Sequence, residues 1–103
     1  MRKVNYRIRA AASKDLADIW EYTFKRWSKD QADRYHGLII SEIEYIAEND
    51  TAGKDMSHVK EDYLVTYVKS HMIFFKRQQG IVHVIRIPHL ADLHGAITHF
   101  APL

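Results

Sequence analysis

The chain has 103 residues, of which 47% are hydrophobic and 27% are charged, and its formal net charge at pH 7 is +2. This size and composition fit one folded domain over residues 1–103, and they exclude a disordered chain. The sequence contains no cysteine, which excludes disulfides and thiolate chemistry. No apolar stretch has the length of a signal-peptide core or a membrane span, so we expect a soluble, cytoplasmic protein without a membrane partner.

The charge is distributed unevenly along the chain. Residues 1–12 carry a net charge of +4, residues 13–50 carry −4 and residues 51–103 carry +2. If strands and helices form separate layers, the sheet layer is basic, and this asymmetry favours an anionic partner, either nucleic acid or an acidic protein segment. A mixed soluble surface accounts for the same numbers, and on charge alone it is the simpler interpretation.

The first 27 residues predict a strand and a helix. Val4, Tyr6 and Ile8 alternate with polar residues, which is the period of a half-buried strand. Ser13 can cap a helix over residues 14–27. The apolar stripe of this helix consists of Leu16, Ile19, Trp20, Phe24 and Trp27. We expect the aromatic side chains of the stripe to pack in the core, whereas Tyr22 lies off the stripe.

A second helix follows after a very short connection. Ser28 and Gln31 fit a capping box, and the helical pattern ends near Glu48. The apolar stripe consists of Ala32, Tyr35, Ile39, Ile43 and Ile46, widened by Leu38. Because the link is so short, the two helices must form an antiparallel hairpin. The polar residues 49–60 predict a loop.

The second half of the chain predicts a β-meander. Residues 63–69, 72–77 and 81–87 are dense in β-branched and aromatic residues, and Gly80 supplies the positive φ of a tight hairpin. Pro88 ends the last strand. Beyond it, a short C-terminal helix is compatible with the spacing of Leu90, Leu93, Ile97 and Phe100. The predicted fold is α+β, a helical hairpin on a mainly antiparallel four-stranded sheet in the order β-α-α-β-β-β.

Candidate chemical groups gather in the meander. Five basic or imidazole groups lie on neighbouring predicted strands or just beyond them: Lys69, Lys76, Arg77, Arg86 and His89. An arginine that stabilises a phosphorane-like charge beside a histidine acid would make a metal-independent ribonuclease. Solvated bases that guard exposed strands are the commoner explanation.

Other catalytic constellations find little support. His89, His94 and His99 recur every five residues, a spacing that does not stack side chains on one helical face, so we expect no metal site. The four glycines are isolated, which argues against a phosphate loop, and no nucleophile-elbow signature is present. We therefore expect no cofactor.

Several sequence pieces, in this order and spacing, resemble the ParE toxins of bacterial toxin–antitoxin modules, within the RelE/ParE superfamily. The resemblance covers nearly the whole chain. It is carried by ASKDLADIWEYT (12–23), by Trp27 with Gln31, Ala32 and Tyr35, by GKDMS (53–57), by HMIFFK (71–76) and by IRIPH (85–89). In the last piece Pro88 stands where the family pattern has leucine. The segment after His89 is shorter than in the family and lacks its methionine.

The resemblance implies the same hairpin-on-sheet fold and a toxin, without its own chemistry, that inhibits DNA gyrase. It also implies a ParD-like ribbon-helix-helix antitoxin, which binds DNA, wraps the toxin with its tail and forms a hetero-oligomer with it, so that the toxin meets DNA only indirectly. The RelE branch instead cuts messenger RNA on the ribosome. In that alternative the catalytic residues would be Arg86, His89, Lys69 and Lys76. A non-toxic relative kept for antitoxin binding is a third hypothesis.

Two sets of binding residues follow as expectations. The candidates for target binding are Lys76, Arg77, Arg86 and His89. The candidates for antitoxin binding are Tyr22, Trp27, Tyr35 and Leu38. We expect the antitoxin tail to cross exposed apolar residues of the hairpin and to run along a free sheet edge, where strand addition satisfies unpaired backbone groups.

Overall fold

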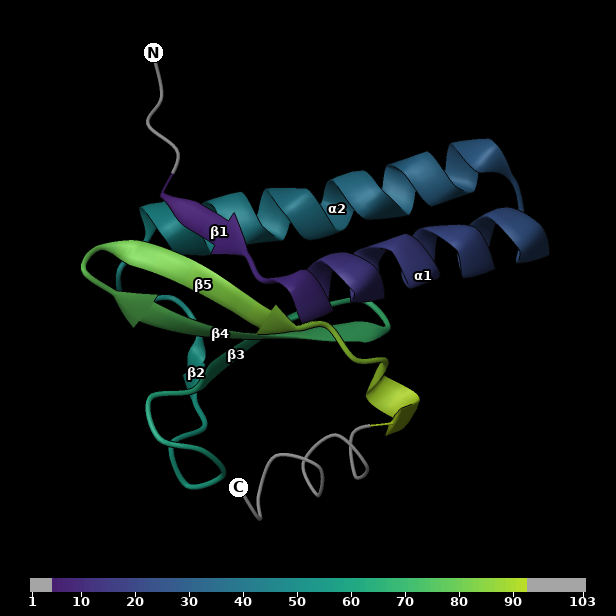
Figure 1. The fold of residues 1–103 in the computed structure, drawn as a ribbon. Coiled ribbons are helices and arrows are strands. Elements are labelled where there is room, and N and C mark those ends of the chain that lie inside the picture. The colour runs from purple at the N-terminus through teal and green to yellow at the C-terminus, as the bar shows by residue number, and fades with distance from the viewer. Residues whose placement is uncertain (1–4, 93–103) are drawn as a thin grey trace.

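The computed structural model describes residues 5–92. In chain order the elements are β1 (Tyr6–Ile8), α1 (Ala10–Arg26), α2 (Lys29–Glu48), β2 (Lys54–Asp55), β3 (Leu64–Val68), β4 (His71–Gln78), β5 (Ile81–Arg86) and the 3-10 turn η1 (Leu90–Asp92). The antiparallel helices α1 and α2 cover one side of the sheet, and their connected ends extend beyond it (Figure 1). The predicted α+β fold is confirmed. Neither helix within the described range is long and apolar enough to cross a membrane.

The sheet has five strands in the order β1-β5-β4-β3-β2. The predicted meander forms its antiparallel centre, and β1 joins the sheet parallel to β5. The prediction of four strands was wrong, because the loop expected over residues 49–60 contains β2, which pairs with β3. A strand of two residues has no room for the alternation that identifies strands in a sequence.

Both tight connections of the meander have the backbone that hairpins require. Lys69 has a φ of 47° in the β3–β4 turn. Gln79 and Gly80 have φ values of 54° and 76°, as in a two-residue turn that matches the twist of the strands. The role predicted for Gly80 is confirmed.

The helix boundaries agree with the prediction at one end of the hairpin and differ at the other. The Ser28 hydroxyl accepts a hydrogen bond from the Gln31 backbone N–H at 3.1 Å, and α2 ends at Glu48 as predicted. The cap predicted at Ser13 was wrong, since α1 begins at Ala10 and its N-cap is Arg9. Three consecutive alanines have high helix propensity and extend the helix toward β1.

Apolar side chains are buried on both faces of the sheet. One cluster joins the helices to the sheet and includes Ile39, Ile43, Phe75, Val82 and Val84. The second lies on the opposite face and consists of Met56, Tyr63, Val65, Met72 and Phe74. The loop before β3 therefore covers part of the outer face. Of the predicted C-terminal helix, the structure shows the η1 turn, and residues 93–103 lie outside the described range.

Candidate functional site

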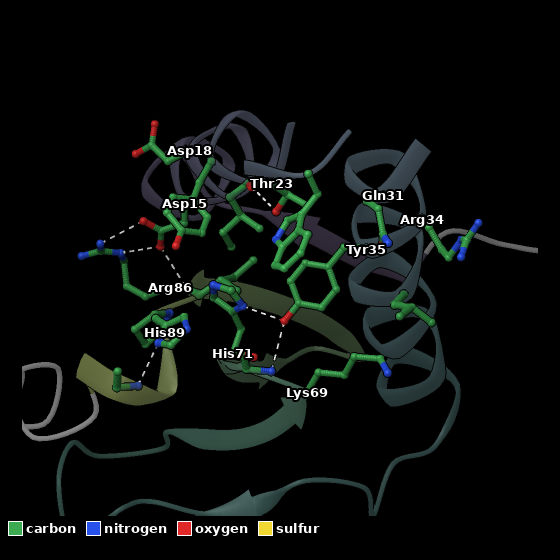
Figure 2. Close-up of a pocket in the computed structure, with 18 residues that line it drawn as sticks. Asp15, Asp18, Thr23, Gln31, Arg34, Tyr35, Lys69, His71, Arg86 and His89 are labelled. Carbon is green, nitrogen blue, oxygen red and sulfur yellow. Dashed lines mark hydrogen bonds and ion pairs between the residues drawn. The ribbon is translucent and has the colours of Figure 1, made fainter. Parts of the chain in front are cut away.

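A groove of about 1180 Å³ opens between the helical hairpin and the end of the sheet where β3 turns into β4. Side chains from α1, α2, this turn and the segment after β5 line it (Figure 2). All four predicted antitoxin-binding residues are among them: Tyr22, Trp27, Tyr35 and Leu38. The structure also brings Lys69, Arg86 and His89 of the predicted catalytic alternative into the same groove.

Apolar side chains that remain exposed form the outer part of the groove. Tyr22 is 64% exposed, Trp27 66% and Leu38 40%. The core packing predicted for Phe24 and Trp27 was wrong, because α1 extends past the sheet there and no strand lies beneath it (Figure 1). Trp20 instead stacks on Phe24, with ring centroids 5.2 Å apart. A hydrophobic surface of this kind at a concave site favours a macromolecular partner.

Arg86 is fixed at one end of the groove by Asp15 of α1. Its Nε and Nη2 atoms donate to the two carboxylate oxygens at 2.8 Å and 3.0 Å, and the Ile87 backbone N–H donates to the same carboxylate at 2.8 Å. The hydrogen bond to Asp15 raises the pKa of Arg86. The pair ties α1 to the end of β5. The carboxylate of Asp15 also offsets the positive charge of Arg86, which a ribonuclease would direct at the phosphate of its substrate.

Tyr35 ties α2 to the β3–β4 turn. Its hydroxyl lies 3.0 Å from the Val68 carbonyl and 2.7 Å from His71 Nδ1, and it accepts a hydrogen bond from the Ser70 backbone N–H at 3.2 Å. Burial raises the pKa of Tyr35, so the phenol is neutral at pH 7. Tyr35 therefore lines the groove, and its hydroxyl holds α2 to the β3–β4 turn through hydrogen bonds.

His71 and His89 lie together at the floor of the groove (Figure 2). Their rings meet edge to face with centroids 5.0 Å apart, and their backbones form an isolated β-bridge. His89 Nδ1 accepts a hydrogen bond from the Ala91 backbone N–H at 2.9 Å. His71 was not among the predicted site residues, and its position beside Tyr35 and His89 follows from the tertiary structure. His71 begins β4, and the chain after Pro88 returns alongside it, which brings the two histidines together.

The predicted target-binding residues do not form one surface. Arg86 and His89 line the groove, whereas Arg77 donates to the carbonyls of Ile46 and Asn49 at 3.1 Å and 2.7 Å and so caps the end of α2. Lys76 lies over the Tyr63 ring on the opposite face of the sheet. Among residues 5–92, no group of three or more histidine or acidic side chains could hold a metal ion.

A family model described as the ParE toxin of the type II toxin–antitoxin system parDE matches residues 6–93. The chain belongs to this family. The match includes both helices, all five strands and the groove between them, so the groove is part of the ParE domain.

Individual ParE relatives agree with the family match. Toxin ParE1 of Caulobacter vibrioides is 34% identical over 82% of this chain and 86% of its own length. Toxin ParE1 of Mycobacterium tuberculosis is 29% identical over 82% of this chain and 87% of its own length. A solved structure described as the chromosomal ParDE TA system from P. aeruginosa superposes with a TM-score of 0.73 at 13% identity, over 84% of this chain and 96% of that one. This last likeness supports the fold.

Proposed function

We propose that this chain is a cytoplasmic toxin that inhibits DNA gyrase and is neutralised by a ParD-like ribbon-helix-helix antitoxin. Membership of the ParE family and the resemblance of the sequence pieces to gyrase-directed toxins support the target. The groove supports the antitoxin, because it collects Tyr22, Trp27, Tyr35 and Leu38 on one concave surface. This gathering is the observation that carries the proposal.

The antitoxin tail places apolar side chains in the groove and packs them against Tyr22, Trp27 and Leu38. Aromatic residues in a concave, apolar site are the usual centres of binding energy at protein interfaces. An extended part of the tail adds to one of the edge strands, β1 or β2, because edge strands offer unpaired backbone groups. Toxin and antitoxin then form a hetero-oligomer that meets operator DNA through the antitoxin.

Two exposed tyrosines on the hairpin provide a matched test of the antitoxin surface. Tyr22 lines the groove, whereas Tyr45 of α2 is 55% exposed and lies outside it. Tyr22→Ala should weaken binding of the cognate antitoxin about tenfold or more in calorimetry, and Tyr45→Ala should change it less than twofold. Equal losses in the two variants would mean that the groove is not the binding surface.

The gyrase target is tested with purified components. The chain should stop plasmid supercoiling by gyrase, and preincubation with the antitoxin should restore it. Uninhibited supercoiling at a large molar excess of the chain, with gyrase fully active in the control reaction, would refute the target. A growth assay after induction separates a toxin from a non-toxic relative that binds only the antitoxin.

A ribonuclease is the second candidate, because Lys69, His89 and Arg86 share the groove with His71 and Tyr35. The ion pair of Arg86 with Asp15 weighs against it. Mapping of transcript ends after induction tests this activity: it predicts new ends that disappear in His89→Ala. Cleavage that persists in both His89→Ala and Arg86→Ala would exclude these residues as its catalysts.

A further inference from the structure

A row of cationic side chains crosses the outer face of the sheet, the face turned away from the helices. Val82 and Val84 are buried in the helix-side core, so His83 between them points outward. Tyr6 and Ile8 pack against the same core, which places Arg7 on the outer face. Strand alternation thus directs cations from neighbouring strands to one surface.

The strand registers align these side chains. Arg7 of β1 pairs with His83 of β5, and His83 pairs with Lys76 of β4. Lys76 lies over the Tyr63 ring, which belongs to the outer-face cluster. Arg9 completes the set, because its Nε lies 3.3 Å from His83 Nδ1. We call Arg7, His83, Lys76 and Arg9 the basic row; its outer members lie two strand spacings, about 10 Å, apart.

The charges in the basic row repel one another. Burial, followed by the positive charges of Arg9, Arg7 and Lys76, lowers the pKa of His83. The contact from Arg9 Nε also requires His83 Nδ1 to act as the acceptor, which fits a neutral ring. An anion placed over the row would relieve this repulsion and gain a donor from each arginine.

Toward the β4–β5 turn, the neighbours of the basic row are mainly polar. A shallow hollow beside it is lined by Arg7, Gln78, Gln79, Ile81 and His83. Burial of apolar area is the main favourable term when most protein segments bind, and this hollow, with Ile81 as its one apolar lining residue, offers little of it. Phosphates bind through charge and counterion release, with amide side chains as additional donors. These features favour a sugar-phosphate backbone.

The form of the nucleic acid follows from the aromatic side chains. Single strands are held by bases stacked on exposed rings. Tyr63, the ring beside Lys76, is only 7% exposed, and Tyr67, the exposed tyrosine on this face, lies at the far end of β3 from the basic row. We propose that the basic row binds the phosphate backbone of duplex DNA directly, without reading its sequence. This contact is additional to the DNA contact of an antitoxin, and it does not depend on gyrase being the target.

The proposal is tested by fluorescence anisotropy of a labelled duplex DNA titrated with the purified chain at several salt concentrations. Three phosphate contacts, one for each of Arg7, Lys76 and Arg9, predict a slope of log affinity against log salt of about −2.7 and a loss of about 40-fold between roughly 50 and 200 mM salt. The double variant Arg7→Gln/Lys76→Gln should reduce the slope by about 2. The single variants should each reduce it by about 1, which keeps the test open if the double variant fails to fold.

The matched control removes two exposed cations of α1, in Lys14→Gln/Lys25→Gln. Both lie on the helical hairpin, on the opposite side of the sheet from the basic row, and neither lines the groove. This variant should keep the slope of the unmodified chain. The proposal is overturned if duplex DNA does not bind at low salt, or if the control pair matters as much as the row. Equal binding of single-stranded DNA, duplex RNA or polyglutamate through the row would also overturn it.

Discussion

The groove and the basic row differ in the kind of surface that they offer to a partner. In the groove, Arg86 is paired with Asp15, and the exposed area is largely aromatic and aliphatic. On the outer face, the basic row brings four cationic or imidazole groups together beside a hollow lined mainly by polar side chains. Apolar area attracts protein, and unpaired cations attract polyanions. The two proposals follow this difference: the antitoxin takes the groove and duplex DNA takes the basic row, so the two partners need not compete.

The strongest way to break this division is to remove Trp27. Trp27→Ala should weaken antitoxin binding by about 2 kcal/mol, roughly 30-fold, because a tryptophan in an apolar site is a typical centre of binding energy. Duplex DNA binding by the same variant should be unchanged. Lys76→Gln should show the reverse pattern. Calorimetry with the antitoxin and anisotropy with DNA measure both effects, and a variant that weakens both partners equally would refute separate surfaces.

A second comparison concerns two acidic residues of the groove, Asp15, which is paired with Arg86, and Asp18, which is exposed. Asp15→Ala should lower the free energy of unfolding by about 2 kcal/mol, because it removes the hydrogen bonds to Arg86 and Ile87 and leaves the guanidinium unpaired. Asp18→Ala removes an exposed pair with Lys14 and should cost less than about 0.5 kcal/mol. Urea unfolding followed by circular dichroism measures both. Similar losses would show that the Asp15–Arg86 pair does not hold α1 to the sheet.

A smaller effect tests the division within Tyr35 between its ring and its hydroxyl. Tyr35→Phe should cost about 1 kcal/mol of unfolding free energy, since the hydroxyl is hydrogen-bonded to the β3–β4 turn. Antitoxin affinity should stay within about twofold, because the ring that lines the groove is retained. Tyr22→Phe is the matched control and should leave stability unchanged. A large loss of affinity in Tyr35→Phe with normal stability would assign the hydroxyl to binding instead.

The smallest expected effect concerns His83 and pH. Its pKa in the folded chain lies below the ordinary value of 6.5, so the unfolded chain takes up this proton first as the pH falls. The contribution of His83 to stability is therefore present above pH 6.5 and is lost as the pH falls toward the folded pKa. His83→Gln should flatten the decline of the unfolding midpoint between pH 7.5 and 5. An unchanged pH profile would show that neither burial nor the neighbouring cations lower the pKa of His83 in the folded chain.

Local sequence patterns predicted most of the secondary-structure elements of the fold. Alternation predicted the meander, Gly80 its second turn, and Ser28 with Gln31 the start of α2, because each depends on residues close in the chain. The apolar candidates of the groove were also predictable, since Tyr22 lies off the buried stripe and Tyr35 and Leu38 follow the facing stripe of α2. Their gathering in one groove is a consequence of the hairpin.

Features that depend on tertiary geometry were missed. Asp15 and Arg86 are 71 residues apart, and no local pattern connects them. The burial of Trp27 depends on how far the sheet extends beneath α1. The periodicity of apolar residues in a helix carries no information about the size of the sheet. The separation of two target-binding candidates had a signal in the sequence. Lys76 and Arg77 are adjacent on a strand, so their side chains had to point to opposite faces.

The connected ends of α1 and α2, which extend beyond the sheet, link partner binding to the stability of the fold (Figure 1). Beyond the sheet the two helices support each other alone, with Phe24 and Trp27 left partly in water. A partner that packs there extends the hydrophobic core, so docking and folding of this end become one cooperative process. By mass action such a complex melts above the free chain, and its melting temperature rises with partner concentration. Loss of the partner then returns the toxin to the lower stability of the free chain.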